Sequence, residues 1–160
     1  MVDIQTVSIA VASTGVFVAA IYYILQLRHQ TKQRQTDMVL KLYATFGSPE
    51  FQKEYQLVMQ LMFKNPEDYR EKYGKDTETI SALYSVTVFF EGIGLLVKRK
   101  LVSMDLVDDL FSGPVQTTWE KIGVLIEALR ARSRRASAGE WFEYLYTEMK
   151  KREQKPQSGS

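Results

Sequence analysis

The longest uncharged stretch of the sequence runs from Ile4 to Leu27, and helical patterns follow it to the end of the chain. A helix of about 24 residues extends about 36 Å, which exceeds the roughly 30 Å of a bilayer's hydrocarbon core. A cleaved signal peptide is disfavoured because Asp3, and no Lys or Arg, precedes the stretch. A buried core helix is the other alternative, but uncharged core helices are usually shorter. The pattern therefore predicts a transmembrane anchor over residues 1–27.

Charged residues flank this anchor unequally. Arg28, Lys32 and Arg34 follow it closely, whereas Asp3 is the only charged residue before it. The positive-inside rule therefore predicts a single-pass protein of the plasma (inner) membrane, with its N-terminus outside and its C-terminal domain in the cytoplasm. Cations beside an anionic leaflet each contribute about 1 kcal/mol of attraction, so we expect these three to contact lipid headgroups.

Small and polar residues recur along the anchor at alternating steps of three and four, which places them on one side of a helix. Gly15 and Ala19 form a small-xxx-small pair, which lets two helix backbones approach closely in lipid. We expect this stripe to make the protein a homo-oligomer. The alternatives are a pore whose axis the stripe lines, and a plain anchor in which the stripe has no special role. The stripe residues are Gln5, Ser8, Ala12, Gly15, Ala19, Tyr22 and Gln26.

Beyond the anchor, apolar residues at helical spacing predict an all-α protein. Neither Gly nor Pro occurs between Arg28 and Gly47, so a basic neck helix is expected to continue the anchor over residues 28–47. A cytoplasmic bundle of about five or six helices is expected over residues 48–153. The polar residues 154–160 are expected to form a disordered tail.

Local start and stop signals divide the helical domain. Ser48, Asn65, Ser103 and either Asp76 or Thr77 are the expected N-caps. Ser112-Gly113-Pro114 is expected to break one helix and start another. Ser137-Ala138-Gly139-Glu140 has capping-box spacing and is expected to open the last helix.

The most apolar segment of this domain, Ile80 to Val97, is expected to be the central helix of the bundle. A second membrane span is disfavoured there because Glu91 lies inside it. A carboxylate in such a helix must be paired, hydrogen-bonded or protonated. We expect Glu91 to pair with an Arg, a Lys, a Tyr hydroxyl or the Trp119 indole; the alternative is a ligand or proton site with a raised pKa. Gly92 and Gly94 predict close approach of another backbone, or a kink.

The run from Phe90 to Gly94, FEGIG, together with Trp119-Glu120-Lys121 and the segment Trp141 to Leu145, resembles a prokaryotic family of uncharacterised membrane proteins. The Gln26-Leu27-Arg28 neck and the turn from Ser48 to Phe51 are also similar to that family. The resemblance covers nearly the whole chain. It implies one N-terminal span, a basic neck and a helical domain, and it implies no activity.

Composition limits the chemistry that the chain offers. Its 160 residues carry a net charge of +2, no cysteine and one histidine, His29. Disulfides, thiolate chemistry and Cys-based zinc sites are therefore excluded, and few acid–base or metal-binding arrangements remain. We therefore expect no enzyme activity, no cofactor and no metal. The predicted function is a membrane-anchored interaction or regulatory module, in contact with lipid and with a possible protein partner at the helical domain.

Four arginines form the densest basic cluster. They are interpreted either as a site for acidic lipid or a phosphoprotein, or as a solvated helix end whose cations oppose the helix dipole. Nucleic-acid binding is not expected, because neither a recognised fold signature nor an overall basic excess accompanies them. The cluster is Arg130, Arg132, Arg134 and Arg135.

Overall fold

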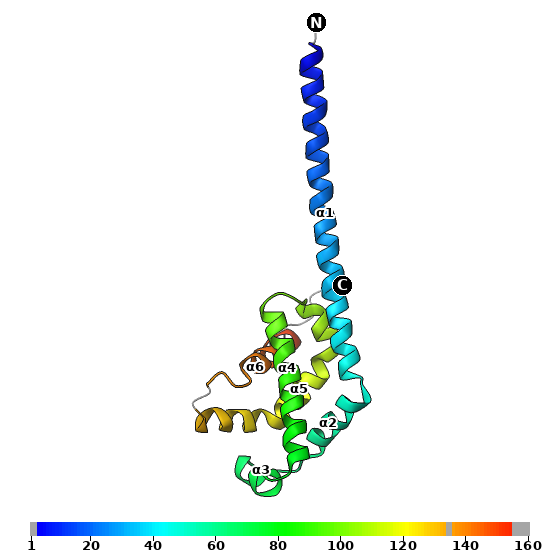
Figure 1. Cartoon of the computed structure of the whole chain (residues 1–160). Helices are drawn as coiled ribbons and strands as arrows, with labels where there is room; N and C mark the ends of the chain where they lie inside the picture. Colours follow the sequence, from blue (N-terminus) through cyan, green and yellow to red (C-terminus); the bar gives the residue numbers. More distant parts are fainter. Residues whose placement is uncertain (1–2, 134–135, 155–160) are drawn as a thin grey trace. The chain divides into compact units, whose positions relative to one another are not determined.

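The computed structural model describes the backbone of residues 3–133 and 136–154, and the side chains of those residues except 4–12. These residues form six helices and no strand, so the predicted all-α class is confirmed (Figure 1). The chain divides into two compact units, Met1–Asp37 and Met38–Ser160, and each is described by itself below. The predicted tail lies almost wholly outside the described residues.

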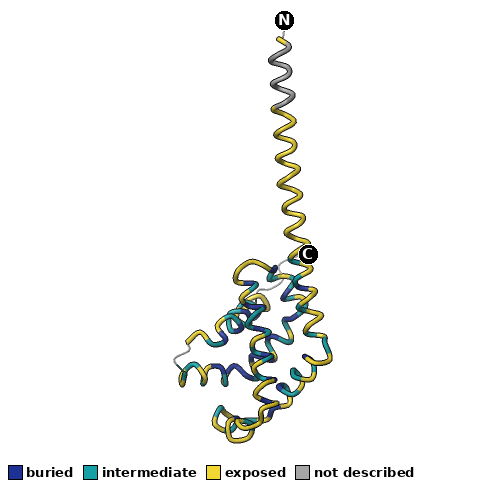
Figure 2. Tube along the Cα trace, in the orientation of Figure 1, coloured by how far each residue is buried: buried dark blue, intermediate teal, exposed yellow. Residues whose placement is uncertain are grey.

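Helix α1 spans Ile4–Phe46. Its residues up to Asp37 belong to the first unit, and its residues from Met38 on belong to the second. The helix continues unbroken from the anchor through the neck, as predicted from the absence of Gly and Pro between Arg28 and Gly47. In the first unit, every described side chain from Ser13 to Arg34 is exposed (Figure 2). The large apolar side chains are among the most exposed of the chain, Val16 at 72% and Phe17 at 71%. The described side chains of the anchor segment, from Ser13 to Leu27, are therefore all exposed.

Helices α2, Pro49–Gln60, α3, Pro66–Tyr73, and α4, Thr77–Lys98, begin at predicted caps. Ser48 Oγ accepts a hydrogen bond from Phe51 N (3.3 Å), and Asn65 Oδ1 accepts one from Asp68 N (2.9 Å). The Asp76 carboxylate caps α4 by accepting from Glu78 N (3.1 Å) and from Thr79 Oγ1 (2.5 Å). Each cap satisfies N–H groups that a helix leaves without partners, so these boundaries are set locally.

Acid should weaken the start of α4. The hydrogen bond from Thr79 Oγ1 is the main cause that holds the pKa of Asp76 below its usual 3.8. A carboxyl with a lowered folded-state pKa stabilises fully above its unfolded value and loses that contribution as the pH falls below it. We expect the chain to lose stability between about pH 5 and about pH 3, and Asp76→Asn, which caps without titrating, to lose less. Urea unfolding at both pH values checks this; equal losses would contradict it.

Helix α5, Met104–Arg132, corrects the predicted break at Ser112-Gly113-Pro114, because it continues through Pro114. A proline inside a helix removes one hydrogen bond and crowds the preceding turn, at a cost of about 3 kcal/mol. The buried stripe continues across it at helical spacing, so ending the helix there would sacrifice more burial than the proline costs. The stripe is Val107, Phe111, Val115, Trp119, Ile122 and Ile126.

An aromatic cluster joins the end of α1 to the rest of the second unit. The Phe46 ring centroid lies 5.3 Å from that of Tyr55 and 5.7 Å from those of Phe51 and Phe111. Val39, on the same helix, is also buried and is 2% exposed. The apolar side chains at the end of α1 therefore pack into the helical body.

Helix α4 has the predicted central place in the second unit. It packs against α2, α5 and α6, and Val86, Phe90 and Ile93 are fully buried. In the part of the chain that the structure describes, α4 is also the one helix long and apolar enough to cross a membrane. Seven residues of α4 are buried among the neighbouring helices, whereas its apolar side chains Ile80, Val88 and Leu95 are exposed.

Candidate functional site

Glu91 lies where the first turn of α6, Glu140–Glu153, meets α4. Its Oε2 accepts a hydrogen bond of 2.8 Å from Phe142 N, one of the unpaired N–H groups at the start of α6. The predicted partners were side chains, and the observed partner is instead a backbone N–H. A carboxylate at a helix N-terminus is favoured by both the hydrogen bond and the helix dipole. The carboxylate therefore has a structural role that the sequence did not identify.

The predicted capping box at Ser137 to Glu140 does not form. The residue before α6 is Gly139, whose φ of 68° is in the left-handed region, and no side chain from this turn caps the helix. Glycine suits this position because it has no Cβ to disfavour a positive φ. Glu140 N donates to the Ser137 carbonyl at 3.2 Å, and Glu91 supplies a side-chain acceptor from another helix.

Phe90, Glu91 and Gly94 of the FEGIG run contact α6. The Phe90 ring stacks on that of Phe142, with centroids 5.1 Å apart, and Ile93 is fully buried. A Cβ built on Gly94 would lie 2.5 Å from the carbonyl carbon of Trp141, and closer still to its oxygen. The predicted close approach is therefore confirmed at Gly94. At Gly92 nothing lies within 4 Å of such a Cβ, so the same explanation is wrong there.

Removal of the Glu91 carboxylate should weaken the docking of α6. We expect Glu91→Ala to lower the free energy of unfolding by about 1 kcal/mol, the usual effect of losing a capping acceptor. Glu91→Gln keeps an acceptor oxygen and should cost less. Urea unfolding followed by tryptophan fluorescence measures both, and Glu127→Ala, at an exposed glutamate of α5, is the control. Equal effects of Glu91→Ala and Glu127→Ala would contradict the capping role.

Two members of the arginine cluster form ion pairs within the chain. Arg130 Nη1 lies 2.6 Å from Glu143 Oε2, and its Nε donates to Ala138 O at 2.6 Å. Arg132 Nη2 lies 2.5 Å from Glu67 Oε1. The sequence shows that these arginines are charged, but it does not show which distant acidic residues pair with them. Arg134 and Arg135 lie outside the described residues.

The predicted stripe and headgroup contacts lie on the exposed helix of the first unit. Gly15, Ala19, Tyr22 and Gln26 are exposed, and the side chains of Gln5, Ser8 and Ala12 lie outside the described part. The predicted headgroup contacts Arg28, Lys32 and Arg34 are exposed as well.

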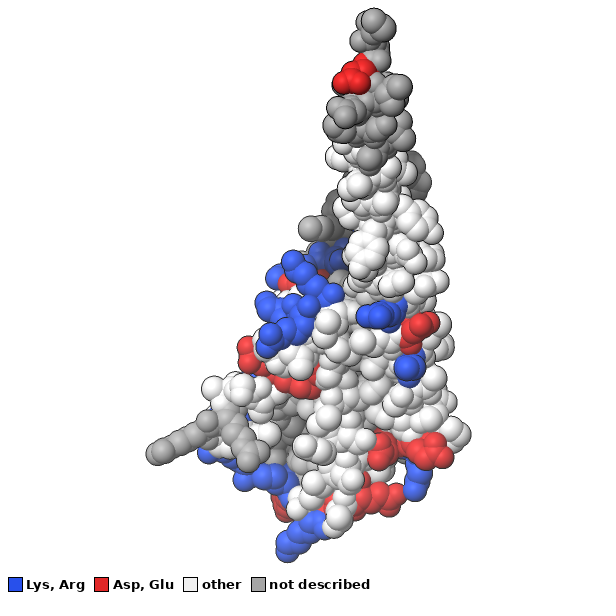
Figure 3. Space-filling model, turned by 45° about the horizontal axis from the view of Figure 1, so that its top comes forward, with Lys and Arg blue, Asp and Glu red and all other residues white. Residues whose placement is uncertain are grey.

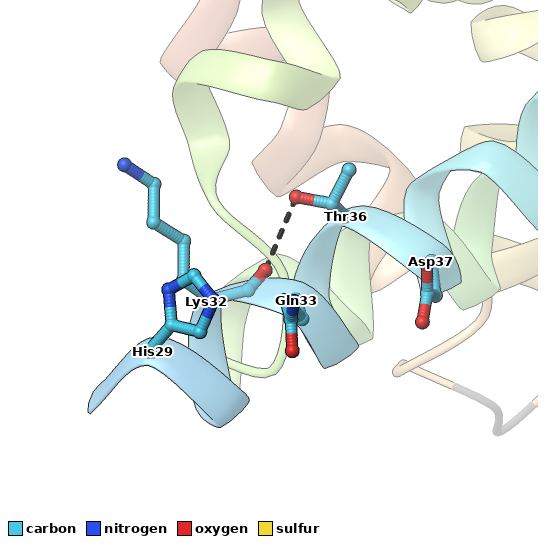
Figure 4. A pocket seen from close by; sticks show the side chains of 5 residues that line it. All are labelled: His29, Lys32, Gln33, Thr36 and Asp37. Atoms are coloured by element: carbon cyan, nitrogen blue, oxygen red, sulfur yellow. Dashed lines mark hydrogen bonds between the residues drawn. The ribbon is translucent and has the colours of Figure 1, made fainter. Parts of the chain in front are cut away.

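In the same part of α1, a shallow surface is lined by His29, Lys32, Gln33, Thr36 and Asp37 (Figure 4). Thr36 Oγ1 donates to Lys32 O at 3.1 Å, an interaction within the helix itself. With one imidazole and one carboxylate, this face lacks a set of metal ligands.

A groove of about 280 Å³ between α3, α4 and α5 was not predicted. Its walls are mostly apolar, with Ile80, Leu125 and Leu129, and Arg132 lies among the lining residues. Tyr69 also lines it, and the Tyr69 hydroxyl is buried with no hydrogen-bond partner among the described residues. Burial raises the pKa of this hydroxyl, and the charge of Asp76 raises it further.

The described residues contain no group of three or more His, Asp or Glu side chains placed to hold a metal ion. A family model with the description "Domain of unknown function (DUF4760)" matches residues 9–149. The predicted membership of an uncharacterised family is thereby confirmed. No curated protein and no solved structure matches the chain.

Proposed function

For this chain, which belongs to the DUF4760 family of unknown function, we propose a membrane-anchored, homo-oligomeric interaction or regulatory module without catalytic activity of its own. The observation that carries the proposal is the exposed apolar helix of the first unit. Its uncharged segment, Ile4 to Leu27, is long enough to cross a bilayer, and its described large apolar side chains are exposed. Exposed apolar surface of this extent is typical of contact with lipid or with another chain.

The proposed topology follows from the flanking charges. Arg28, Lys32 and Arg34 remain on the cytoplasmic side of the plasma membrane and contact headgroups there, and the N-terminus is outside. Because the chain lacks cysteine, single cysteines at Asp3 and Lys151 report each side without background. In intact cells, a membrane-impermeant maleimide should label the first and not the second. The reverse pattern would contradict the topology.

Self-association through the small-residue stripe is tested by crosslinking in native membranes. Gly15→Cys places a thiol on the stripe, and Phe17→Cys, about 200° further round the helix, places one on the opposite side. Close packing of two stripes brings the Gly15→Cys thiols within disulfide range and separates the Phe17→Cys thiols. We expect oxidised dimers from Gly15→Cys only. Equal crosslinking of both variants, or of neither, would contradict a stripe-mediated oligomer.

The alternative function is a pore lined by the same stripe. It predicts ion flux through reconstituted full-length protein, abolished by Gly15→Leu, which would fill the axis. We favour the interaction module because the second unit offers a partly apolar groove at α3, α4 and α5 for a protein partner. Vesicles that stay impermeable while the oligomer is intact would support this preference.

A further inference from the structure

The groove between α3, α4 and α5 belongs to a larger apolar surface of the second unit. Ile80 and Leu129 on its walls are exposed. Tyr84 and Val88 follow Ile80 along α4 at steps of four residues, and both are exposed as well. Figure 3 shows an uncharged surface along the middle of the second unit, and charged side chains at the end where α3 lies in Figure 1. An apolar centre with a charged rim is typical of a protein interface.

Two arginines that line the groove share a single carboxylate. Arg70 Nη2 lies 3.2 Å and Arg132 Nη2 lies 2.5 Å from the same oxygen, Glu67 Oε1. Within the described part of the chain, no other hydrogen bond or ion pair holds either guanidinium. Two positive charges that face one negative charge leave this rim with a surplus positive charge. A further carboxylate would balance that charge, because each guanidinium has donors to spare.

A wall of the groove also contains a buried polar atom without a partner. Tyr69 lines the groove and is 8% exposed, and its hydroxyl makes no hydrogen bond to any described residue. Burial is the main cause that raises the pKa of this hydroxyl, so at neutral pH it is protonated and can donate. A buried donor without an acceptor is unfavourable, and a bound molecule that brings an oxygen to it would remove that cost.

The walls favour a helix over an extended peptide as the occupant. An extended segment must find hydrogen-bond partners for its backbone, and apolar side chains such as Leu83 and Leu125 provide none. Strand addition needs the edge of a sheet, and the described residues form no strand. A helix satisfies its own backbone and presents apolar side chains one turn apart.

The size of the groove favours side chains over a whole small molecule. Its volume of about 280 Å³ is below the range of roughly 300–1,000 Å³ that is typical of sites for small molecules. A few apolar side chains of a docked helix would fill it.

We propose that this groove binds one helix of an acidic, amphipathic protein partner. Apolar side chains one turn apart on that helix enter the groove against Ile80, Leu125 and Leu129, and a carboxylate on the same face pairs with Arg70 and Arg132. The proposal rests on the interaction module proposed above, and it names the chemistry of the partner. The groove lies wholly within the second unit, so binding requires no particular position of the first.

Selection from a displayed library of helical peptides, randomised on one face, tests the proposal on the full chain in lipid nanodiscs. We expect the selected peptides to share two apolar residues one turn apart and an acidic residue on the same face. Leu129→Ser should weaken their binding about tenfold, the effect of losing a central apolar contact. Val124→Ser is the matched control and should leave binding unchanged. Val124 lies on the same helix and is 44% exposed, against 51% for Leu129, but it does not line the groove.

A charge reversal tests the carboxylate contact separately. Arg132→Glu should weaken the binding of a selected acidic peptide about fivefold, as expected for a partly exposed ion pair. A lysine in place of the acidic residue of the peptide should restore binding to this variant. The Arg132 side chain is 44% exposed, so the fold should be retained, which unfolding by urea verifies. Equal binding of both peptides to both proteins would overturn the proposal.

Several outcomes of the selection would also overturn it. These are peptides with a basic or uncharged face, no selected peptide, or peptides that bind the Leu129→Ser variant as well as the original chain. Calorimetric binding of decanoate that Leu129→Ser abolishes, without a selected peptide, would assign the groove to an acyl chain instead. Selected sequences that match a helix of this chain would assign it to a second copy.

The failure of the anchor is distinguishable from the failure of this site. A chain that does not enter nanodiscs loses the anchor, and the same peptides are then measured against the chain in water. Acidic peptides that bind there in the manner expected would leave the groove proposal standing without the anchor.

Discussion

Gly94→Ala is expected to destabilise the helical body by about 3 kcal/mol, whereas Gly92→Ala, two residues earlier, is expected to stabilise it by about 1 kcal/mol. At Gly94 the added methyl group would overlap the carbonyl of Trp141, and a backbone group cannot rotate away as a side chain does. At Gly92 the methyl group has open space, so only the higher helix propensity of alanine remains.

The two variants control for each other, because they make the same change on the same helix. Urea unfolding of the full chain in detergent, followed by tryptophan fluorescence, measures both. Trp119 and Trp141 lie at the contacts of α6, so the signal reports its detachment directly. Similar effects from the two substitutions would contradict the close crossing of α4 and α6.

Phe111→Ala is expected to cost about 4 kcal/mol, because Phe111 is fully buried and truncation of a buried aromatic ring leaves a cavity. Its ring lies 6.1 Å from that of Tyr43 and 5.7 Å from that of Phe46, both at the end of α1. The variant should therefore also release residues 38–46 from the body, which hydrogen exchange of those amides detects. Tyr84→Ala, at a side chain that is 71% exposed, should change stability by less than about 0.5 kcal/mol. Unchanged exchange in Phe111→Ala would contradict the packing of α1 into the second unit.

Features set by neighbouring residues were predictable from the sequence. The caps at Ser48, Asn65 and Asp76 act within three residues, and the apolar spacing of α4 and α6 needs only the helical period. The helix break expected at Pro114 does not occur. The cost of a proline inside the helix is outweighed by the burial of the apolar stripe on both sides of it.

The contacts of the FEGIG run were only partly predictable, because they join residues far apart in the sequence. The sequence indicates that a glycine in α4 admits another backbone, but Gly92 and Gly94 look alike until Trp141 is placed beside one of them. The partner of Glu91 is a backbone N–H, which every residue except proline possesses, so no sequence signal identifies it. The acidic residues that pair with Arg130 and Arg132 lie on other helices, far away in the sequence, so the sequence does not identify them either.

The central claim is that residues 4–27 cross the bilayer, and flotation after alkaline extraction tests it most directly. Full-length protein from native membranes, washed with alkaline carbonate and placed below a density gradient, should rise with the lipid. Recovery of the extracted protein as a soluble species at the bottom of the gradient would contradict the claim.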